Sequence, residues 1–211
     1  MRTKEQRQFL QCTAALTMLI DHIGVIFFPT VLGFRAIGRL SFPLFAFGIA
    51  EGVSHTHDFW RYFRRLLLTA VLSQPIYQMV FGLHQGNPLF TLAWGAAVLY
   101  CHQNGKRGWT ALLLAGSFLG NISYGWYGVW TIFFFGFYQK RESLCFYGEL
   151  ILTGLYSFFT GVWLQLLSLF SFGFLEGNWR IRAMCLSFPR YFFYCFYPLH
   201  VLVLGGIRLL L

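Results

Sequence analysis

Two adjacent ionisable residues, Asp21 and His22, lie inside an apolar run over residues 9–28 that is long enough to cross a bilayer. At membrane depth an acid and an imidazole must be desolvated, paired or hydrated, which costs free energy, so both are functional candidates. The next apolar run supplies a partner, because Arg35 and Arg39 are four residues apart and share one helix face. At 1.5 Å per residue, His22 and Arg39 each lie roughly 9 Å from an end of their run. Since neighbours in sequence do not face each other on a helix, we predict that Asp21 pairs with Arg39 rather than with His22.

Further polar residues occupy similar depths in the later apolar runs. Amide and hydroxyl groups between membrane helices often act only in packing, which is the alternative for each of them taken alone. Several runs that contribute polar groups at one depth favour a substrate site. The candidate binding residues are Gln74, Gln78, Asn87, Thr91 and, near the midplane in the last run, His200. Asp21, His22 and Arg39 are expected at one depth and are together called the charged layer. Pro43, four residues after Arg39, cannot donate a backbone hydrogen bond and therefore predicts a bend beside this layer.

A second charged cluster follows the second apolar run. It contains Glu51 and His55, and then Arg64 and Arg65, whose guanidinium groups can hold a phosphate by charge-assisted hydrogen bonds. The alternative is a solvated basic flank of a membrane helix. The two histidines of the cluster, His55 and His57, are two residues apart and do not share a helix face, so no metal site is predicted.

Composition predicts the fold class. Of the 211 residues, 57% are hydrophobic and 11% charged, whereas soluble domains carry about 25% charged residues. The apolar runs are continuous, so we predict an all-α, polytopic helical membrane protein forming a single domain over residues 1–211. The five scattered cysteines indicate neither a disulfide framework nor a zinc site. About nine transmembrane helices are expected, near 9–28, 34–53, 65–82, 88–102, 109–121, 124–138, 143–160, 162–175 and 190–210.

Basic residues predict the orientation. They precede the first run and follow the second, fourth, sixth and eighth, so 13 of the 16 fall on one side. Positive residues stay on the cytoplasmic side, which places the N-terminus there. The net charge of +9 is therefore a topology signal and indicates no nucleic acid partner. The residues behind this count are Arg2, Lys4, Arg7, Arg61, Arg64, Arg65, Lys106, Arg107, Lys140, Arg141, Arg180, Arg182 and Arg190.

Several motifs resemble the TraX family of polytopic bacterial membrane proteins, named for acetylation of the N-terminus of the conjugative pilin. The resemblance covers nearly the whole chain. It is carried by the segments at 15–24, with Asp21-His22-Ile23-Gly24, at 39–47, at 51–56, at 73–75, at 87–95 and at 196–200. More distantly, the pattern is similar to other multi-span acyltransferases that use acyl-CoA and a histidine in the first span.

The resemblance implies an acetyltransferase of the bacterial cytoplasmic (inner) membrane, with cytosolic acetyl-CoA as co-substrate and no metal. The acceptor would be a protein N-terminus or another cell-surface amine or hydroxyl, reached from the outer half of the membrane. His22 suits the role of base or acetyl carrier because an imidazole titrates near neutral pH, and direct transfer and an acetyl-histidine intermediate both stay open. Arg39, Gln74 or Asn87 could stabilise the oxyanion. After His55-Thr56 the family usually has a basic residue, whereas this chain has His57 at that position.

Two other functions fit the same residues. Intramembrane Asp, His and Arg also mark the ion pathway of a proton-coupled transporter or permease. A transporter would favour an internal inverted repeat with broken helices in matching positions, and the sequence has none. A non-catalytic assembly factor for a surface structure would not need basic loops combined with a buried histidine. The sequence leaves the acceptor and the oligomeric state open.

Overall fold

The computed structural model describes residues 3–176 and 192–211, and every regular element in these two ranges is a helix. The predicted all-α class is therefore confirmed for the described part of the chain. Arg2, Arg180, Arg182 and Arg190, and the first residues of the last predicted span, lie outside it. The elements are α1 (Lys4–Phe27), α2 (Leu32–Gly38), α3 (Ser41–His55), α4 (Phe59–Phe81), α5 (Pro88–Gln103), α6 (Arg107–Gly116), α7 (Gly125–Phe135), α8 (Glu142–Thr160), the 3-10 helix η1 (Trp163–Phe170), α9 (Ser171–Glu176) and α10 (Phe192–Leu210).

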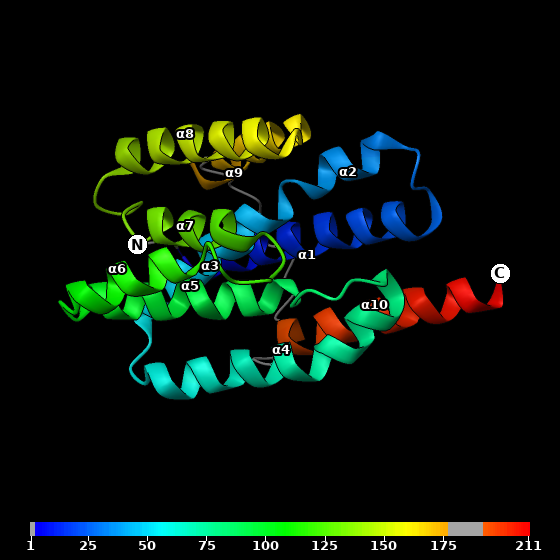
Figure 1. Cartoon of the computed structure of the whole chain (residues 1–211), viewed down its shortest axis with the longest axis horizontal. Coiled ribbons are helices and arrows are strands. Elements are labelled where there is room, and N and C mark those ends of the chain that lie inside the picture. Colours follow the sequence, from blue (N-terminus) through cyan, green and yellow to red (C-terminus); the bar gives the residue numbers. More distant parts are fainter. Residues whose placement is uncertain (1–2, 177–191) are drawn as a thin grey trace.

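The long helices run side by side along the longest axis of the molecule (Figure 1). The start of the chain and the α3–α4, α5–α6 and α7–α8 connections lie at one end, on the left of the picture. The C-terminus and the α1–α2 and α4–α5 connections lie at the other. Because Lys106 and Lys140 lie in the first set of connections and Arg61 lies in the first turn of α4 beside them, we call that end the basic end. The alternation of basic loops along the sequence thus corresponds to one end of the fold.

α3 forms the centre of the fold. It packs against α1, α5 and α7, and most of its residues are buried. Phe47 is a representative anchor: it is 2% exposed and meets the rings of Phe135 and Tyr138 edge-on at 5.8 and 5.4 Å between centroids. Edge-to-face contacts of this kind add to the burial of the apolar rings. The resulting core gives α1 and α2 a rigid surface to pack on.

The second predicted span, 34–53, is divided into two helices. α2 ends at Gly38 and α3 begins at Ser41, so the chain breaks next to Arg39. Pro43 lies in the first turn of α3, where a backbone N–H has no partner within the helix and its loss is tolerated. The predicted bend beside the charged layer exists, but it precedes the proline rather than lying within a continuous helix.

The predicted count of nine membrane spans is wrong when the helices are judged by their length and composition. Among the described residues, three stretches are long and apolar enough to cross a membrane: Glu5–Phe27, Leu32–His55 and Phe192–Leu210. α5, α6 and α7 have 16, 10 and 11 residues, short of the ~20 that a full crossing needs. α4 and α8 have 23 and 19 residues, but the arginines and glutamines of α4 and the glutamates of α8 lower their hydropathy.

Candidate functional site

A pair of histidines joins the first helix to the last. His22 of α1 lies with its Nδ1 2.7 Å from Nε2 of His200 in α10. The Nδ1 atom of His200 is 2.6 Å from the backbone oxygen of Phe196, one turn earlier in α10. The two imidazole planes are only 5° apart. α1 and α10 pack against each other, so this contact belongs to a helix interface.

These contacts assign the protons of the neutral pair. A carbonyl oxygen can only accept, so Nδ1 of His200 donates to Phe196 and Nε2 of His200 carries a lone pair. Nδ1 of His22 must then donate to His200, which leaves a lone pair on Nε2 of His22. No partner for that nitrogen lies within hydrogen-bonding distance in residues 3–176 or 192–211. Nε2 of His22 is therefore the basic, nucleophilic atom of the pair.

Aromatic side chains surround the histidine pair. The ring of Phe81, at the end of α4, is 5.1 Å from that of His22, and Tyr197 meets His22 edge-on at 6.4 Å. Phe196 stacks on His200 at 4.7 Å. Such an apolar surrounding limits water and strengthens electrostatic interactions inside it.

Asp21 pairs with Arg35, so the predicted pairing with Arg39 is wrong. One guanidinium nitrogen of Arg35 lies 2.8 Å from each carboxylate oxygen of Asp21. Gly38 packs directly on the Asp21 carboxylate, where any side chain at that position would overlap it. The break after α2 changes the direction of Arg39 relative to α2, and the arginine one turn earlier takes its place. Asp21 and His22 thus face different partners, as expected for neighbours on a helix.

Arg39 instead reaches a residue that the sequence analysis missed. Its Nη1 donates to Oε1 of Gln165 in η1 at 2.8 Å, and Nε2 of Gln165 donates to the hydroxyl of Tyr127 at 3.1 Å. Gln165 and Tyr127 are fully buried. A glutamine in the middle of an apolar run was the available signal, but only the fold places it opposite Arg39.

The polar residues of α4 and α5 hold the α4–α5 connection together. Nε2 of Gln74 donates to the backbone oxygen of Gln85, and Oε1 of Gln74 accepts from the backbone N–H of Asn87. Asn87 caps α5 and donates to the backbone oxygen of Ala70. Thr91 donates to the backbone oxygen of Ser123.

These hydrogen bonds give the predicted binding residues of α4 and α5 a structural role in the fold. Gln74, Asn87 and Thr91 thus have side-chain hydrogen bonds within the fold, and their role as substrate ligands stays a prediction. Gln78 is exposed, one turn after Gln74, and its side chain makes no hydrogen bond within the described residues. Both ring nitrogens of His200 are engaged by His22 and Phe196, and its role as a substrate ligand stays a prediction.

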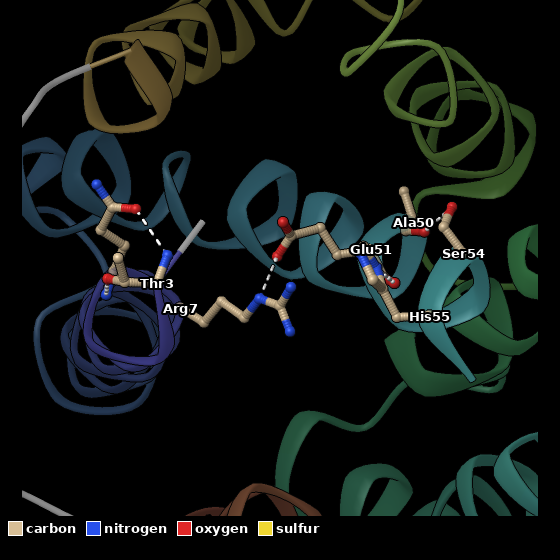
Figure 2. Close-up of polar contacts among 7 residues, drawn as sticks. Thr3, Arg7, Ala50, Glu51, Ser54 and His55 are labelled. Atoms are coloured by element: carbon tan, nitrogen blue, oxygen red, sulfur yellow. Dashed lines mark hydrogen bonds and ion pairs between the residues drawn. The ribbon is translucent and has the colours of Figure 1, made fainter. Parts of the chain in front are cut away.

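The second charged cluster lies at the basic end. Figure 2 shows Arg7 reaching from α1 towards Glu51 on α3, with 3.7 Å between Arg7 Nε and Glu51 Oε2. His55 turns its Nδ1 to the backbone oxygen of Glu51, 2.8 Å away. On α4, Arg64 is exposed and Arg65 is half-buried. Glu51 and His55 thus contribute to helix contacts, while Arg64 can meet a solvent-borne anion.

The two clusters are far apart. Phe81, which contacts His22, is 16 residues after Arg65 on the same helix, or roughly 24 Å at 1.5 Å per residue. The structure therefore brings together His22, His200, Asp21, Arg35 and Arg39 near one end, and leaves Arg64 and Arg65 at the basic end.

Comparison with known proteins gives a consistent set of relatives. The family model described as TraX protein matches residues 6–208. The probable fimbrial assembly protein FimC, serogroup H1, of Dichelobacter nodosus is 33% identical over 100 residues, 40% of this chain and 41% of that protein. Protein TraX of Escherichia coli is 33% identical over 126 residues, 57% of this chain and 51% of that protein. The matched stretches thus span about half the length of these relatives. No solved structure matches.

Proposed function

Because this chain belongs to the TraX family, we propose that it is a membrane-embedded acetyltransferase. It moves an acetyl group from cytosolic acetyl-CoA to an amine or hydroxyl acceptor at or beyond the outer half of the bacterial cytoplasmic membrane. The single observation that supports this best is the lone pair on Nε2 of His22, fixed by the hydrogen bond to His200 and surrounded by aromatic rings. An imidazole whose tautomer is set by a second group is the usual form of an acyl-transfer base.

In this mechanism His22 moves one proton. Nε2 takes the proton from the acceptor as its nitrogen or oxygen attacks the thioester carbon. The carbon–sulfur bond then breaks, and the proton passes from Nε2 to the leaving thiolate, so the reaction balances for a hydroxyl and for a neutral amine acceptor. An acetyl-His22 intermediate uses the same nitrogen as a nucleophile. While His22 is an imidazolium, its Nδ1–H still donates to His200.

The basic end is the proposed entrance of the donor. Acetyl-CoA carries several phosphates, which suit the guanidinium groups of Arg64 and Arg65. From there the pantetheine arm would extend along α4 towards Phe81 and His22. The gathering of basic connections at this end supports a cytoplasmic orientation for it and a multi-pass arrangement.

The acceptor side is the opposite end, where α1 ends close to His22. One relative is named a fimbrial assembly protein, which supports a protein N-terminus of a surface appendage as acceptor. We propose this class of acceptor together with other cell-surface amines and hydroxyls.

Donor binding is testable without the acceptor. Purified protein in detergent is titrated with acetyl-CoA in a calorimeter, and Arg64→Gln/Arg65→Gln is expected to weaken binding about 10–100-fold, since each phosphate loses a charge-assisted partner. Arg208→Gln, on α10 at the opposite end, is the matched control and should leave the Kd unchanged. A wild-type protein that gives no heat with acetyl-CoA, or a double variant with unchanged Kd, would contradict the proposed donor site.

His200 is expected to act as a positioning residue for His22. His200→Leu removes the acceptor of the His22 Nδ1–H and should lower kcat for acetyl transfer about 10–100-fold with little change in the KM for acetyl-CoA. His200→Gln can place an amide oxygen near the former Nε2 and should recover most of the rate. The check is the initial rate of label transfer from acetyl-CoA to native membranes. Equal losses in both variants would argue against positioning through this hydrogen bond.

A further inference from the structure

Tyr197 of α10 has a buried hydroxyl that the hydrogen bonds described above do not use. Tyr197 is only 4% exposed, and its hydroxyl has no hydrogen-bond partner within residues 3–176 and 192–211. The ring meets that of His22 edge-on at 6.4 Å and that of His200 at 5.8 Å, with interplanar angles of 68° and 72°. The phenol thus belongs to the same helix interface as the proposed base.

An unpartnered phenol in an apolar interior is costly, and phenylalanine would fill the same volume without that cost. Buried polar groups in native proteins are nearly always hydrogen-bonded, so this hydroxyl calls for a ligand. Two other tyrosines, Tyr77 and Tyr124, lie within electrostatic range of this hydroxyl, and Tyr124 in turn lies within electrostatic range of Asp21, Arg35 and Arg39. Tyr197 therefore contacts the histidine pair and lies within electrostatic range of Tyr124, which in turn is near the charged residues Asp21, Arg35 and Arg39.

Among the other oxyanion donors predicted from the sequence, Asn87 and Gln74 are engaged elsewhere, whereas Arg39 keeps a buried Nε with no hydrogen-bond partner within the described residues. Nδ2 of Asn87 donates to Ala70, and Nε2 of Gln74 donates to Gln85. Nη1 of Arg39 donates to Gln165. A free donor beside His22 is what an acyl transfer needs at the carbonyl oxygen, and Tyr197 offers one.

We propose that the Tyr197 hydroxyl donates a hydrogen bond to the oxyanion of the tetrahedral intermediate; this rests on the proposed acetyl transfer. As the acceptor atom bonds to the thioester carbon, the carbonyl π electrons move to oxygen, and Tyr197 stabilises the negative charge while keeping its own proton. When the carbonyl re-forms, the carbon–sulfur bond breaks and the thiolate takes the proton held by His22. Tyr197 is then a catalytic residue, because it contacts a reacting atom.

The test is Tyr197→Phe in the full chain, assayed by label transfer from acetyl-CoA and by thermal unfolding in detergent. Loss of one oxyanion donor should lower kcat about 10²–10³-fold, with the KM for acetyl-CoA within about twofold of wild type. The melting temperature should stay equal or rise, because an unpaired hydroxyl is removed from the interior. If Tyr197 had only a structural role, Tyr197→Phe would lower the stability of the protein. It would not lower kcat while leaving KM unchanged.

Tyr77→Phe is the matched control. Tyr77 is 5% exposed, but its hydroxyl already has a partner in Nε2 of Gln85, so its removal should leave kcat near wild type. The inference is overturned if Tyr197→Phe keeps kcat within about threefold of wild type, or if both variants lose rate equally. If the wild type transfers no acetyl group, the proposed function fails and this inference fails with it, a result distinct from an active wild type and an unaffected variant.

Discussion

Replacing His22 with asparagine is expected to lower acetyl transfer from labelled acetyl-CoA by about 10²–10⁴-fold, the usual contribution of a positioned acid–base group. The side-chain N–H of asparagine can occupy the place of Nδ1 and still donate to His200, so the α1–α10 contact is kept while Nε2 is lost. The rate measured in native membranes, at equal amounts of folded protein, reports the loss of that one atom.

The complementary variant sharpens the result. His22→Gln can place an amide nitrogen where Nε2 lies but carries no lone pair on it, and it should be as inactive as asparagine. Both variants should bind acetyl-CoA with wild-type Kd, because the proposed phosphate site is at the other end of α4. Undiminished transfer in either one would remove His22 from the reaction.

Asp21→Asn is expected to destabilise the protein by about 2–3 kcal/mol, because it leaves the Arg35 guanidinium without its anion. The value is set below that of a fully buried pair because 32% of the Arg35 side chain and 17% of the Asp21 side chain are exposed. Unfolding in detergent measures the loss for Asp21→Asn, Arg35→Gln and the double variant. Since the double variant leaves no lone charge, it should be more stable than the sum of the two losses predicts, by at least about 1 kcal/mol.

Arg39 provides the comparison for this cycle. Arg39→Gln combined with Asp21→Asn should give a smaller coupling energy than the Arg35 cycle, because Arg39 donates to Gln165 rather than to Asp21. Coupling that is larger for Arg39 than for Arg35 would restore the pairing predicted from the sequence and contradict the observed one.

The sequence could predict the charged layer but not its pairing. The depth of His22 and the helix face shared by Arg35 and Arg39 follow from helical geometry. Which arginine meets Asp21 depends on the break between α2 and α3 and on the close packing of Gly38 against the carboxylate. Periodicity within a continuous helix carries no information on such a break.

Contacts between distant parts of the chain could not be predicted from the sequence either. His22 and His200 are 178 residues apart, and Arg39 and Gln165 are 126 apart. A single sequence shows that each is polar within an apolar run and therefore needs a partner, but the choice of partner depends on which helices pack together. The partners of Gln74 and Asn87 could not be predicted either. Both side chains lie at the α4–α5 connection and donate to backbone oxygens.

The span count failed for a related reason. Runs of apolar residues mark where helices form, and each of the nine predicted runs contains helix within the described residues. Helix length is set by where the chain turns, and five of the elements end after 11 residues or fewer. A short apolar helix can pack inside a helical fold without crossing the bilayer by itself.

We propose that the His22 imidazole, as base or as acetyl carrier, serves the transfer of an acetyl group from a donor on the basic side to an acceptor on the other side. The most direct measurement uses sealed inside-out vesicles of the native membrane, with labelled acetyl-CoA added outside, where the cytoplasmic face is exposed. Label is expected on acceptors in the lumen when the wild-type chain is present, and not when it is absent. Folded, correctly oriented wild-type protein that leaves the lumen unlabelled would contradict it.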